Sequence, residues 1–337
     1  MPEKHTFDSP ELRRRIFASL PSTPGKVDVR ELLSKLLDDQ RRGWAQCAEG
    51  YDGLRMTRKR ELAVGDFPVW LQFNPRRIVS TGARVDEQSI RERPCFLCVE
   101  NLPAQQKGLS FRDDTLILCN PNPIFERHFT AADINHVPQD LGANIGKFMS
   151  LAEAVSPAYS VFYNGPRCGA SAPDHLHFQL SPRGSVPVER DSEEESRLRD
   201  LGAFKSVRCA MIRGYGRTAL ILRTSGKDLL AEAVMRLIGE MRLVSGSEGE
   251  PMMNVLCSLE EGEWKVIIFP RRKHRPDVFF AGEGRNVTVS PALVDMGGLV
   301  VTPVLRDFES LDGSIVGRIF REVSCSENEA EALVRRL

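Results

Sequence analysis

The stretch VFYNGPRCGASAPDHLHFQLSPRG, residues 161–184, decides how the fold of this chain is interpreted. It begins as an apolar strand that ends at a Gly-Pro pair, and it ends in an alternating strand. On the second strand His175, His177 and Gln179 share one face, ~6–7 Å apart. Burying two imidazoles and an amide in a row without partners costs solvation, so the row indicates a functional site. The alternative is that both histidines are ordinary half-buried sheet residues.

The loop before the histidines has the composition of a phosphate-binding loop. Its glycines, Gly165 and Gly169, let backbone N–H groups approach an anion, and the side chains of Asn164, Arg167 and Ser171 can add donors. A neutral imidazole beside such a loop indicates nucleophilic attack on phosphorus.

Length and composition narrow the class of protein. The chain has 337 residues, a formal net charge of zero and 27% charged residues. That length fits one large or two modest domains, and the lack of a basic surplus argues against a nucleic-acid partner. No apolar run approaches the ~20 residues of a membrane span, and the N-terminus lacks a signal-peptide core. With eight largely scattered cysteines, we expect a cytoplasmic protein without a membrane partner.

Hydrophobic patterning predicts an α+β fold in three parts. Residues 1–65 are expected to form an N-terminal helical extension. Strand and helix patterns then alternate twice, over 66–200 and 201–337, which indicates two pseudo-repeated halves around a mixed or antiparallel sheet flanked by helices.

The segment YNGPRCGASAPDHLHFQ resembles the active-site strand of the histidine-triad superfamily, in its transferase branch with the motif His-x-His-x-Gln. That branch includes galactose-1-phosphate uridylyltransferase, diadenosine tetraphosphate phosphorylase and GDP-L-galactose phosphorylase. The resemblance implies a histidine-triad-like catalytic half at 66–200, a degenerate second half, His177 as nucleophile and Gln179 as a phosphate ligand. A carbonyl or carboxylate must hold the His177 tautomer, and the sequence does not identify it. Leu176 stands where the uridylyltransferases have proline, which favours the phosphorylases.

Cys95 and Cys98 form the one closely spaced cysteine pair. In a reducing compartment the spacing indicates a metal half-site or a redox pair, and the Pro/Gln/Gly loop that follows favours metal. The family resemblance implies a structural zinc ion held by these cysteines, His128 and His175. His136 is the competing fourth ligand, and plain thiols are the alternative.

The resemblance also implies contacts outside the two motifs. Asn120 and Asn122 are candidates for base or ribose contacts, although asparagines that only form turns are an equal alternative. Arg76 and Arg77 are candidates for phosphate contacts, with a solvated arginine pair as the alternative. Lys273, near the end of a predicted strand, is a further candidate for the donor or acceptor phosphate.

Together these features predict a nucleotidyltransferase or phosphorylase with ping-pong kinetics. An NDP-sugar or dinucleoside polyphosphate would transfer its nucleotide to His177 and then to inorganic phosphate or a sugar phosphate. Two alternatives remain: a zinc-dependent phosphohydrolase and a non-catalytic nucleotide-binding regulatory protein. A homodimer is an open alternative for the assembly. The sequence sets neither the base and sugar nor the role of residues 1–65.

Overall fold

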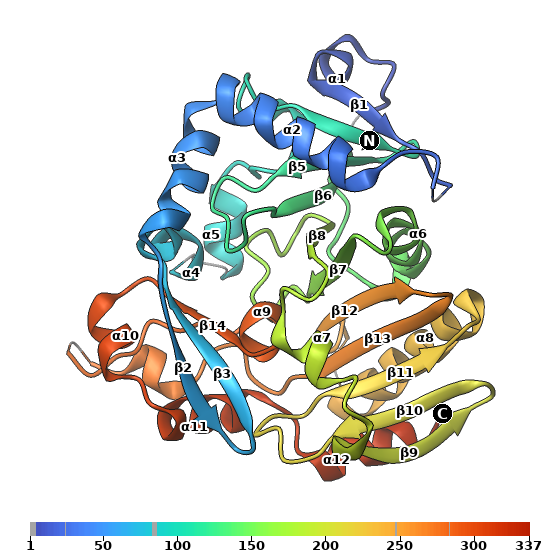
Figure 1. Ribbon diagram of the computed structural model, residues 1–337, viewed down its shortest axis with the longest axis vertical. Coiled ribbons are helices and arrows are strands. Elements are labelled where there is room, and N and C mark those ends of the chain that lie inside the picture. Colours follow the sequence, from blue (N-terminus) through green and yellow to red (C-terminus); the bar gives the residue numbers. More distant parts are fainter. Residues whose placement is uncertain (1–4, 24, 83–85, 247, 283) are drawn as a thin grey trace.

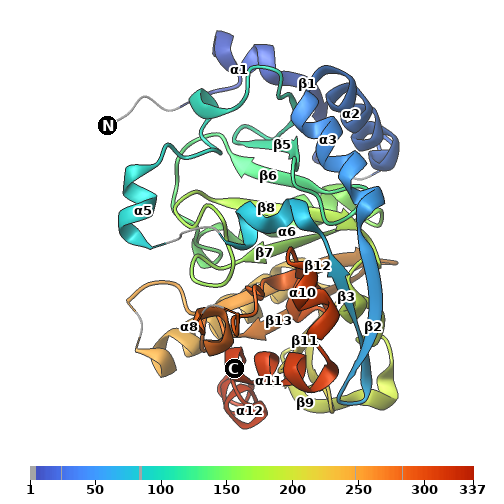
Figure 2. The ribbon, with the colours of Figure 1, turned by 90° about the vertical axis from the view of Figure 1, so that its left-hand side faces the viewer.

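The computed structural model describes residues 5–23, 25–82, 86–246, 248–282 and 284–337. The described chain forms an 11-stranded sheet and a 3-stranded sheet, with helices packed against both (Figures 1 and 2). In the part that the structure describes, no helix has the length and apolar character needed to span a bilayer. The predicted α+β class with a large mixed sheet is confirmed.

The large sheet runs continuously from one end of the molecule to the other (Figure 1). All neighbouring strands pair antiparallel except β1 and β4, which are parallel. In spatial order the strands are β1 (Ile16–Leu20), β4 (Gly108–Phe111), β5 (Thr115–Cys119), β6 (Phe129–Asp133), β8 (His177–Pro182), β7 (Tyr159–Asn164), β12 (Met253–Glu260), β13 (Glu263–Pro270), β11 (Leu220–Thr224), β10 (Val207–Ile212) and β9 (Leu198–Phe204).

Two halves of this sheet share one topology. In each half three consecutive strands lead into a helix, α6 (Ile145–Val155) or α8 (Lys227–Ser245), and two more strands follow. The sheet orders, β4-β5-β6-β8-β7 and β9-β10-β11-β13-β12, correspond strand for strand. The halves join where β7 pairs with β12, with Phe162 opposite Leu256. This symmetry favours the interpretation of two related halves, while the boundary at residue 200 stays a prediction.

The halves differ at the connection between their last two strands. Between β7 and β8 the chain forms the long loop 165–176, whereas β12 and β13 are joined by a tight turn at Glu261 and Gly262. Both turn residues have positive φ, 50° and 82°, as a two-residue hairpin turn requires. Phe162 of β7 lies opposite Gln179, and its counterpart Leu256 of β12 lies opposite Ile267, so Ile267 corresponds to Gln179. Two residues earlier in each strand, Lys265 of β13 therefore stands at the position that His177 has in β8.

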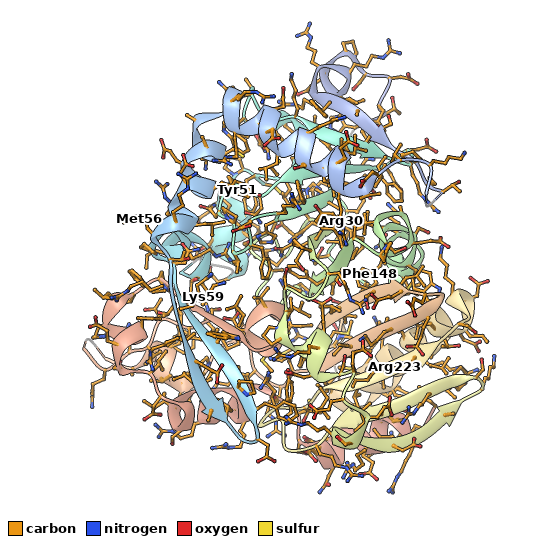
Figure 3. All side chains as sticks on the ribbon, in the orientation of Figure 1. Arg30, Tyr51, Met56, Lys59, Phe148 and Arg223 are labelled. Carbon is orange, nitrogen blue, oxygen red and sulfur yellow. The ribbon has the colours of Figure 1, made fainter. Side chains whose placement is uncertain are left out.

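Each face of the large sheet has its own hydrophobic core. Helices α2 (Val29–Gly43), α3 (Ala45–Gly53), α6, α8 and α12 (Glu327–Val334) cover one face; Tyr51 of α3 and Phe148 of α6 are labelled in Figure 3. The other face packs against the small sheet and short helices. These elements are β14 (Leu299–Thr302), β3 (Phe67–Phe73), β2 (Arg58–Val64), α7 (Pro187–Asp191), α9 (Leu293–Met296), α10 (Leu305–Ser310) and α11 (Gly313–Val323).

Local sequence explains the helix limits. Asp28 caps α2 by accepting hydrogen bonds from the backbone N–H groups of Arg30 and Glu31, at 2.9 and 3.2 Å. Helix α8 ends at Gly246, which adopts the left-handed conformation with φ 60°. The remaining α-helices are α1 (Pro10–Arg15), α4 (Ile78–Thr81) and α5 (Glu87–Glu92).

The N-terminal segment, expected to be helical, also contains two strands. Residues 16–20 extend the edge of the large sheet beside β4, and residues 58–64 form a hairpin with β3 around Gly65, where φ is 60°. In β2 alternate side chains point to opposite faces of the strand, and Leu62 and Val64 are buried in the core. The hydrophobic pattern of this segment therefore has the two-residue period of a strand, unlike the helical pattern before it.

Helix α3 is docked tightly onto the loop that follows β5. A Cβ atom on Gly50 would lie 2.1 Å from the carbonyl oxygen of Pro121, so only glycine allows this approach. The next residue, Tyr51, donates its hydroxyl hydrogen to the His128 carbonyl at 2.7 Å. The helix therefore fixes the start of β6 and the loop beside it.

We expect Gly50→Ala to lower the free energy of unfolding by about 1–3 kcal/mol, because the added methyl group overlaps a backbone carbonyl. Gly146→Ala is the matched control, since a Cβ atom at that helical position meets nothing within 4 Å. The control should gain up to about 1 kcal/mol from helix propensity. Urea denaturation measures both, and equal stabilities of the two variants would contradict the close packing.

Candidate active site

A cleft of about 430 Å³ opens on the sheet face opposite α2 and α6. Its floor comes from β5 to β8, and its sides come from the loop 164–171, the corner between α2 and α3, and C-terminal segments of the second half. The predicted site residues that line it are Arg77, Asn120, Asn122, Asn164, Gly169, Ser171, His177 and Gln179.

The geometry of His177 fixes the tautomer of its ring, and its surroundings keep the ring neutral. Its Nδ1 lies 2.8 Å from the carbonyl oxygen of His175, so we assign the ring hydrogen to Nδ1. This assignment leaves the lone pair on Nε2 of a ring that lines the cleft. Burial lowers the pKa of His177 to about 4, so the ring is neutral near pH 7. The carbonyl that the sequence could not identify is therefore the one of His175.

Gln139 separates β8, the strand that begins with His177, from β7. The ladder between these strands ends with Phe162 opposite Gln179, and the buried amide of Gln139 lies where Asn164 and His177 would otherwise pair. Its Oε1 accepts the His177 N–H at 2.8 Å, and its Nε2 donates to the carbonyl groups of His177 and Asn164, at 3.1 and 3.0 Å. The amide replaces backbone pairing and holds open the gap from which the loop departs.

His128 orients the amide of Gln179. The Ile124 N–H donates to His128 Nδ1 at 3.2 Å, which places the ring hydrogen on Nε2, 2.8 Å from Gln179 Oε1. Burial lowers the pKa of His128 to about 3, so its neutral form and this direction of hydrogen bonding persist. Because Oε1 accepts from His128, the Gln179 NH₂ group is the side available to a ligand in the cleft.

Contacts with the second half hold the loop 164–171 in place. Asn254 Nδ2 donates to Asn164 Oδ1 at 2.8 Å and to the Cys168 carbonyl at 2.7 Å. Gly169 has φ 93°, and a Cβ atom there would lie 2.7 Å from that of Ala292. Arg271, whose pKa burial lowers, donates to Asn254 Oδ1 at 2.6 Å. The loop is therefore shaped by second-half residues that sequence reasoning did not single out for this role.

Four predicted ligand-binding residues lie outside the cleft lining. Gly165 packs against β12, where a Cβ atom would be 2.9 Å from the Met253 carbonyl. Arg167 donates to the Glu250 carbonyl at 3.1 Å. Arg76 pairs with Glu49 at 3.5 Å, and Lys273 pairs with Asp277 and Glu322.

The predicted asparagines and Arg77 make turn and wall contacts within the lining. Asn120 Oδ1 accepts the N–H of Asn122 at 2.9 Å. This contact forms a turn, as expected if Asn120 is a turn-forming asparagine and not a base or ribose contact. Arg77 donates to the Asn122 carbonyl at 2.8 Å, and burial lowers its pKa to about 10 while nearby Asp295 opposes that shift.

Other cationic side chains line the cleft besides Arg77. They are Arg93, which donates to the Ser171 carbonyl at 2.6 Å, and Arg275, which donates to Ser290 Oγ at 2.9 Å. His274 also lines the cleft, but burial lowers its pKa to about 4, so its ring is neutral near pH 7. In the sequence, the basic run at 271–275 indicated that cationic side chains lie near the site. It did not show which of these residues face the cleft.

A separate cluster of Cys95, Cys98, His136 and His175 has metal-binding geometry. Their ligand atoms lie within 4.8 Å of one another, with Cys98 Sγ 3.1 Å from His136 Nδ1 and Cys95 Sγ 3.4 Å from His175 Nδ1. A tetrahedral zinc site implies sulfur–nitrogen separations of about 3.5 Å, so the residues fit zinc. The prediction of His128 as the fourth ligand is corrected to His136, because both ring nitrogens of His128 are engaged elsewhere.

The outer nitrogens of both histidine ligands also fit a metal site. His175 Nε2 lies 2.8 Å from the Asp133 carbonyl oxygen, and His136 Nε2 lies 3.3 Å from Asp174 Oδ2. These contacts place the ring hydrogens on Nε2 and leave each Nδ1 to face the cysteines. Burial and the neighbouring Cys95 raise the pKa of Cys98 to about 12, an electrostatic cost that a bound cation would offset.

Comparison with known proteins shows a likeness in fold to solved structures. Residues 36–182 match a family described as a domain of unknown function, DUF4922. No curated protein sequence matches. The fold is similar to crystal structures of yeast Ap4A phosphorylase Apa2, which is 16–17% identical in sequence. The AMP complex has a TM-score of 0.57 over 87% of this chain and 96% of that chain, and the Ap4A complex 0.54 over 87% and 97%.

We expect His136→Ala to abolish stoichiometric zinc binding and His128→Ala to retain it, since only His136 belongs to the cluster. Elemental analysis of purified variants measures the metal, and about one zinc ion per chain is expected for the wild type. The reverse pattern would restore His128 as the ligand, and metal-free wild type after refolding with zinc would reject the site.

The carboxyl group of Glu250 gives a prediction for stability. It accepts hydrogen bonds from Tyr163 Oη and the Leu141 N–H, at 2.5 and 2.6 Å, and burial raises its pKa from 4.5 to about 7. Between these values the folded chain keeps a proton that the unfolded chain releases, so rising pH destabilises the folded state. Relative to Glu250→Gln, the wild type should lose about 3 kcal/mol between pH 4.5 and 8. Parallel pH profiles of unfolding would contradict this assignment.

Proposed function

We propose that this protein is a nucleotidyltransferase of the phosphorylase type that works through a covalent nucleotidyl-His177 intermediate. The observation that carries the proposal is the pair of lining residues His177 and Gln179. The contact of His177 Nδ1 with the His175 carbonyl leaves the lone pair of that ring on Nε2, and His128 directs the NH₂ group of Gln179. The fold likeness to a phosphorylase whose structures contain AMP and Ap4A supports it. The proposed donors are an NDP-sugar or a dinucleoside polyphosphate.

In the first half-reaction the α-phosphate lies between the loop 164–171 and the Gln179 amide. Nε2 of His177 attacks phosphorus, the N–P bond forms, and the P–O bond to the distal part of the donor breaks, with the electron pair leaving on that oxygen. The ring becomes cationic as the bond forms. The His175 carbonyl, on Nδ1, stabilises this charge and prevents the ring from turning.

In the second half-reaction an oxygen of inorganic phosphate or a sugar phosphate attacks the same phosphorus. The N–P bond breaks and returns its electron pair to Nε2, so His177 is neutral again. Transfer to phosphate fits Gln179 better than hydrolysis does, because an amide cannot take a proton from water at neutral pH. The cationic lining residues Arg77 and Arg275 offer binding positions for an anionic acceptor.

The remaining parts of the chain have supporting roles in this proposal. A zinc ion on Cys95, Cys98, His136 and His175 would be structural, because four protein ligands fill a tetrahedral shell. Two of its ligands, His136 and His175, lie three residues before Gln139 and two residues before His177, so metal binding would stiffen both segments. Residues 201–337 would be a degenerate copy of the catalytic half that lines the cleft without supplying a nucleophile.

Incubation of the wild type with a panel of NDP-sugars and dinucleoside polyphosphates should add the mass of one nucleoside monophosphate to the intact chain. His177→Ala should show no gain, because it lacks the attacking nitrogen, while His5→Ala is the matched histidine control and should react as the wild type does. Mass spectrometry of the intact protein measures the adduct. Nucleotide binding without an adduct from any donor would reject the covalent mechanism and favour a binding protein.

A further inference from the structure

We infer that the N-terminal segment completes the nucleobase end of the cleft, and that Gln46 contacts the edge of the base and selects among bases. The inference rests on the α-phosphate position of the proposed function. It assigns a role to the α2–α3 corner, which the histidine motif does not explain.

The cleft lining has two chemically different parts. The first, which we call the apolar end, contains Trp44, Leu102, Pro103 and Leu118, and Leu102 and Leu118 belong to one hydrophobic cluster. The second, which we call the cationic end, contains Arg77 and Arg275, and Arg275 donates to the Thr81 carbonyl at 3.1 Å. A nucleotide has the same asymmetry, because its base is flat with apolar faces and its phosphates are anionic. The apolar end therefore suits the base, and the cationic end suits the phosphate chain or the acceptor.

Strand register gives the scale of the apolar end. Gln179 of β8 lies opposite Thr130 of β6, which lies opposite Leu118 of β5, and all three side chains line the cleft. Two strand spacings separate Gln179 from Leu118 by roughly 10 Å. A nucleotide with its α-phosphate on Gln179 thus places its ribose near Thr130 and its base over Leu118, beside the N-terminal corner.

The N-terminal corner is held rigidly against both sides of this end. The buried side chain of Gln40 on α2 donates to the Gln105 carbonyl at 3.2 Å and accepts the Lys107 N–H at 2.9 Å. On the other side, α3 approaches the Pro121 carbonyl at Gly50. The wall that carries Trp44 and Gln46 is therefore fixed relative to Leu102, Pro103 and Leu118.

Gln46 has the chemistry and position to contact a base edge. It lies in the first turn of α3, lines the cleft and is exposed. Its amide offers both a donor and an acceptor, which is the combination that pairs with the polar edge of a nucleobase. Gln106 lines the same end, but it is buried and donates to the Cys119 carbonyl at 3.5 Å.

The test is equilibrium binding of AMP, GMP, UMP and CMP, measured by calorimetry with wild type, Gln46→Ala and Gln105→Ala. Gln105 is an exposed glutamine outside the lining and serves as the matched control. The wild type should prefer one base, and Gln46→Ala should reduce that preference at least about fivefold. The control should keep the preference, and all three proteins should show the same thermal unfolding.

Two results would overturn the inference: a wild type that does not discriminate among the four nucleotides, or a Gln46→Ala variant that keeps the wild-type ratios. A uniform loss of affinity for all four in Gln46→Ala would also overturn it, because Gln46 would then contact ribose or phosphate. Failure of the proposed function is distinguishable, since base-selective binding would persist without any adduct on His177. Absence of binding by all four nucleotides would reject the inference, and the adduct on His177 would still decide the proposed function separately.

Discussion

The site depends on one insertion, the amide of Gln139 between β7 and β8. Strands that stayed paired to their ends would close the sheet, as β12 and β13 do around their tight turn. By satisfying the backbone of His177 and Asn164, the amide lets the strands separate without leaving buried polar groups unpaired. The loop 165–176 begins at this gap. The separation of the strands therefore sets the positions of Gly169, which lines the cleft, and of His177.

The second half shows what the fold becomes without that insertion. Lys265, at the place of His177, is buried, donates to Ser192 Oγ at 3.0 Å and pairs with Glu193, and Ile267 takes the place of Gln179. The second half instead holds the loop 164–171 through Asn254 and Arg271, and segments that follow β13 line the cleft. One half therefore carries His177 and Gln179, and the other shapes the loop beside them.

Much of this arrangement could be predicted from local sequence, because alternation and glycine placement are local signals. From these signals the α+β class, the strand with His177 and the Cys95–Cys98 pair could be predicted. The fourth member of the cysteine and histidine cluster could not be chosen in that way. His128 and His136 flank the same strand, and only the fold shows that their rings reach different partners. Gln139 and Asn254 carried no motif, because their importance comes from where strand pairing stops. The strand at residues 16–20 was hidden by its short length and by a sheet partner far along the chain.

The pairing of β7 with β12 within one chain has a further consequence. Two copies of a five-stranded unit could meet along the same edge as separate subunits, and their cleft would then come apart on dilution. Here the peptide chain between β8 and β9 makes the encounter intramolecular, so the effective concentration of one half for the other is set by a short tether. The cleft, which takes residues from both halves, stays assembled at any protein concentration, and each half is free to change without preserving symmetry.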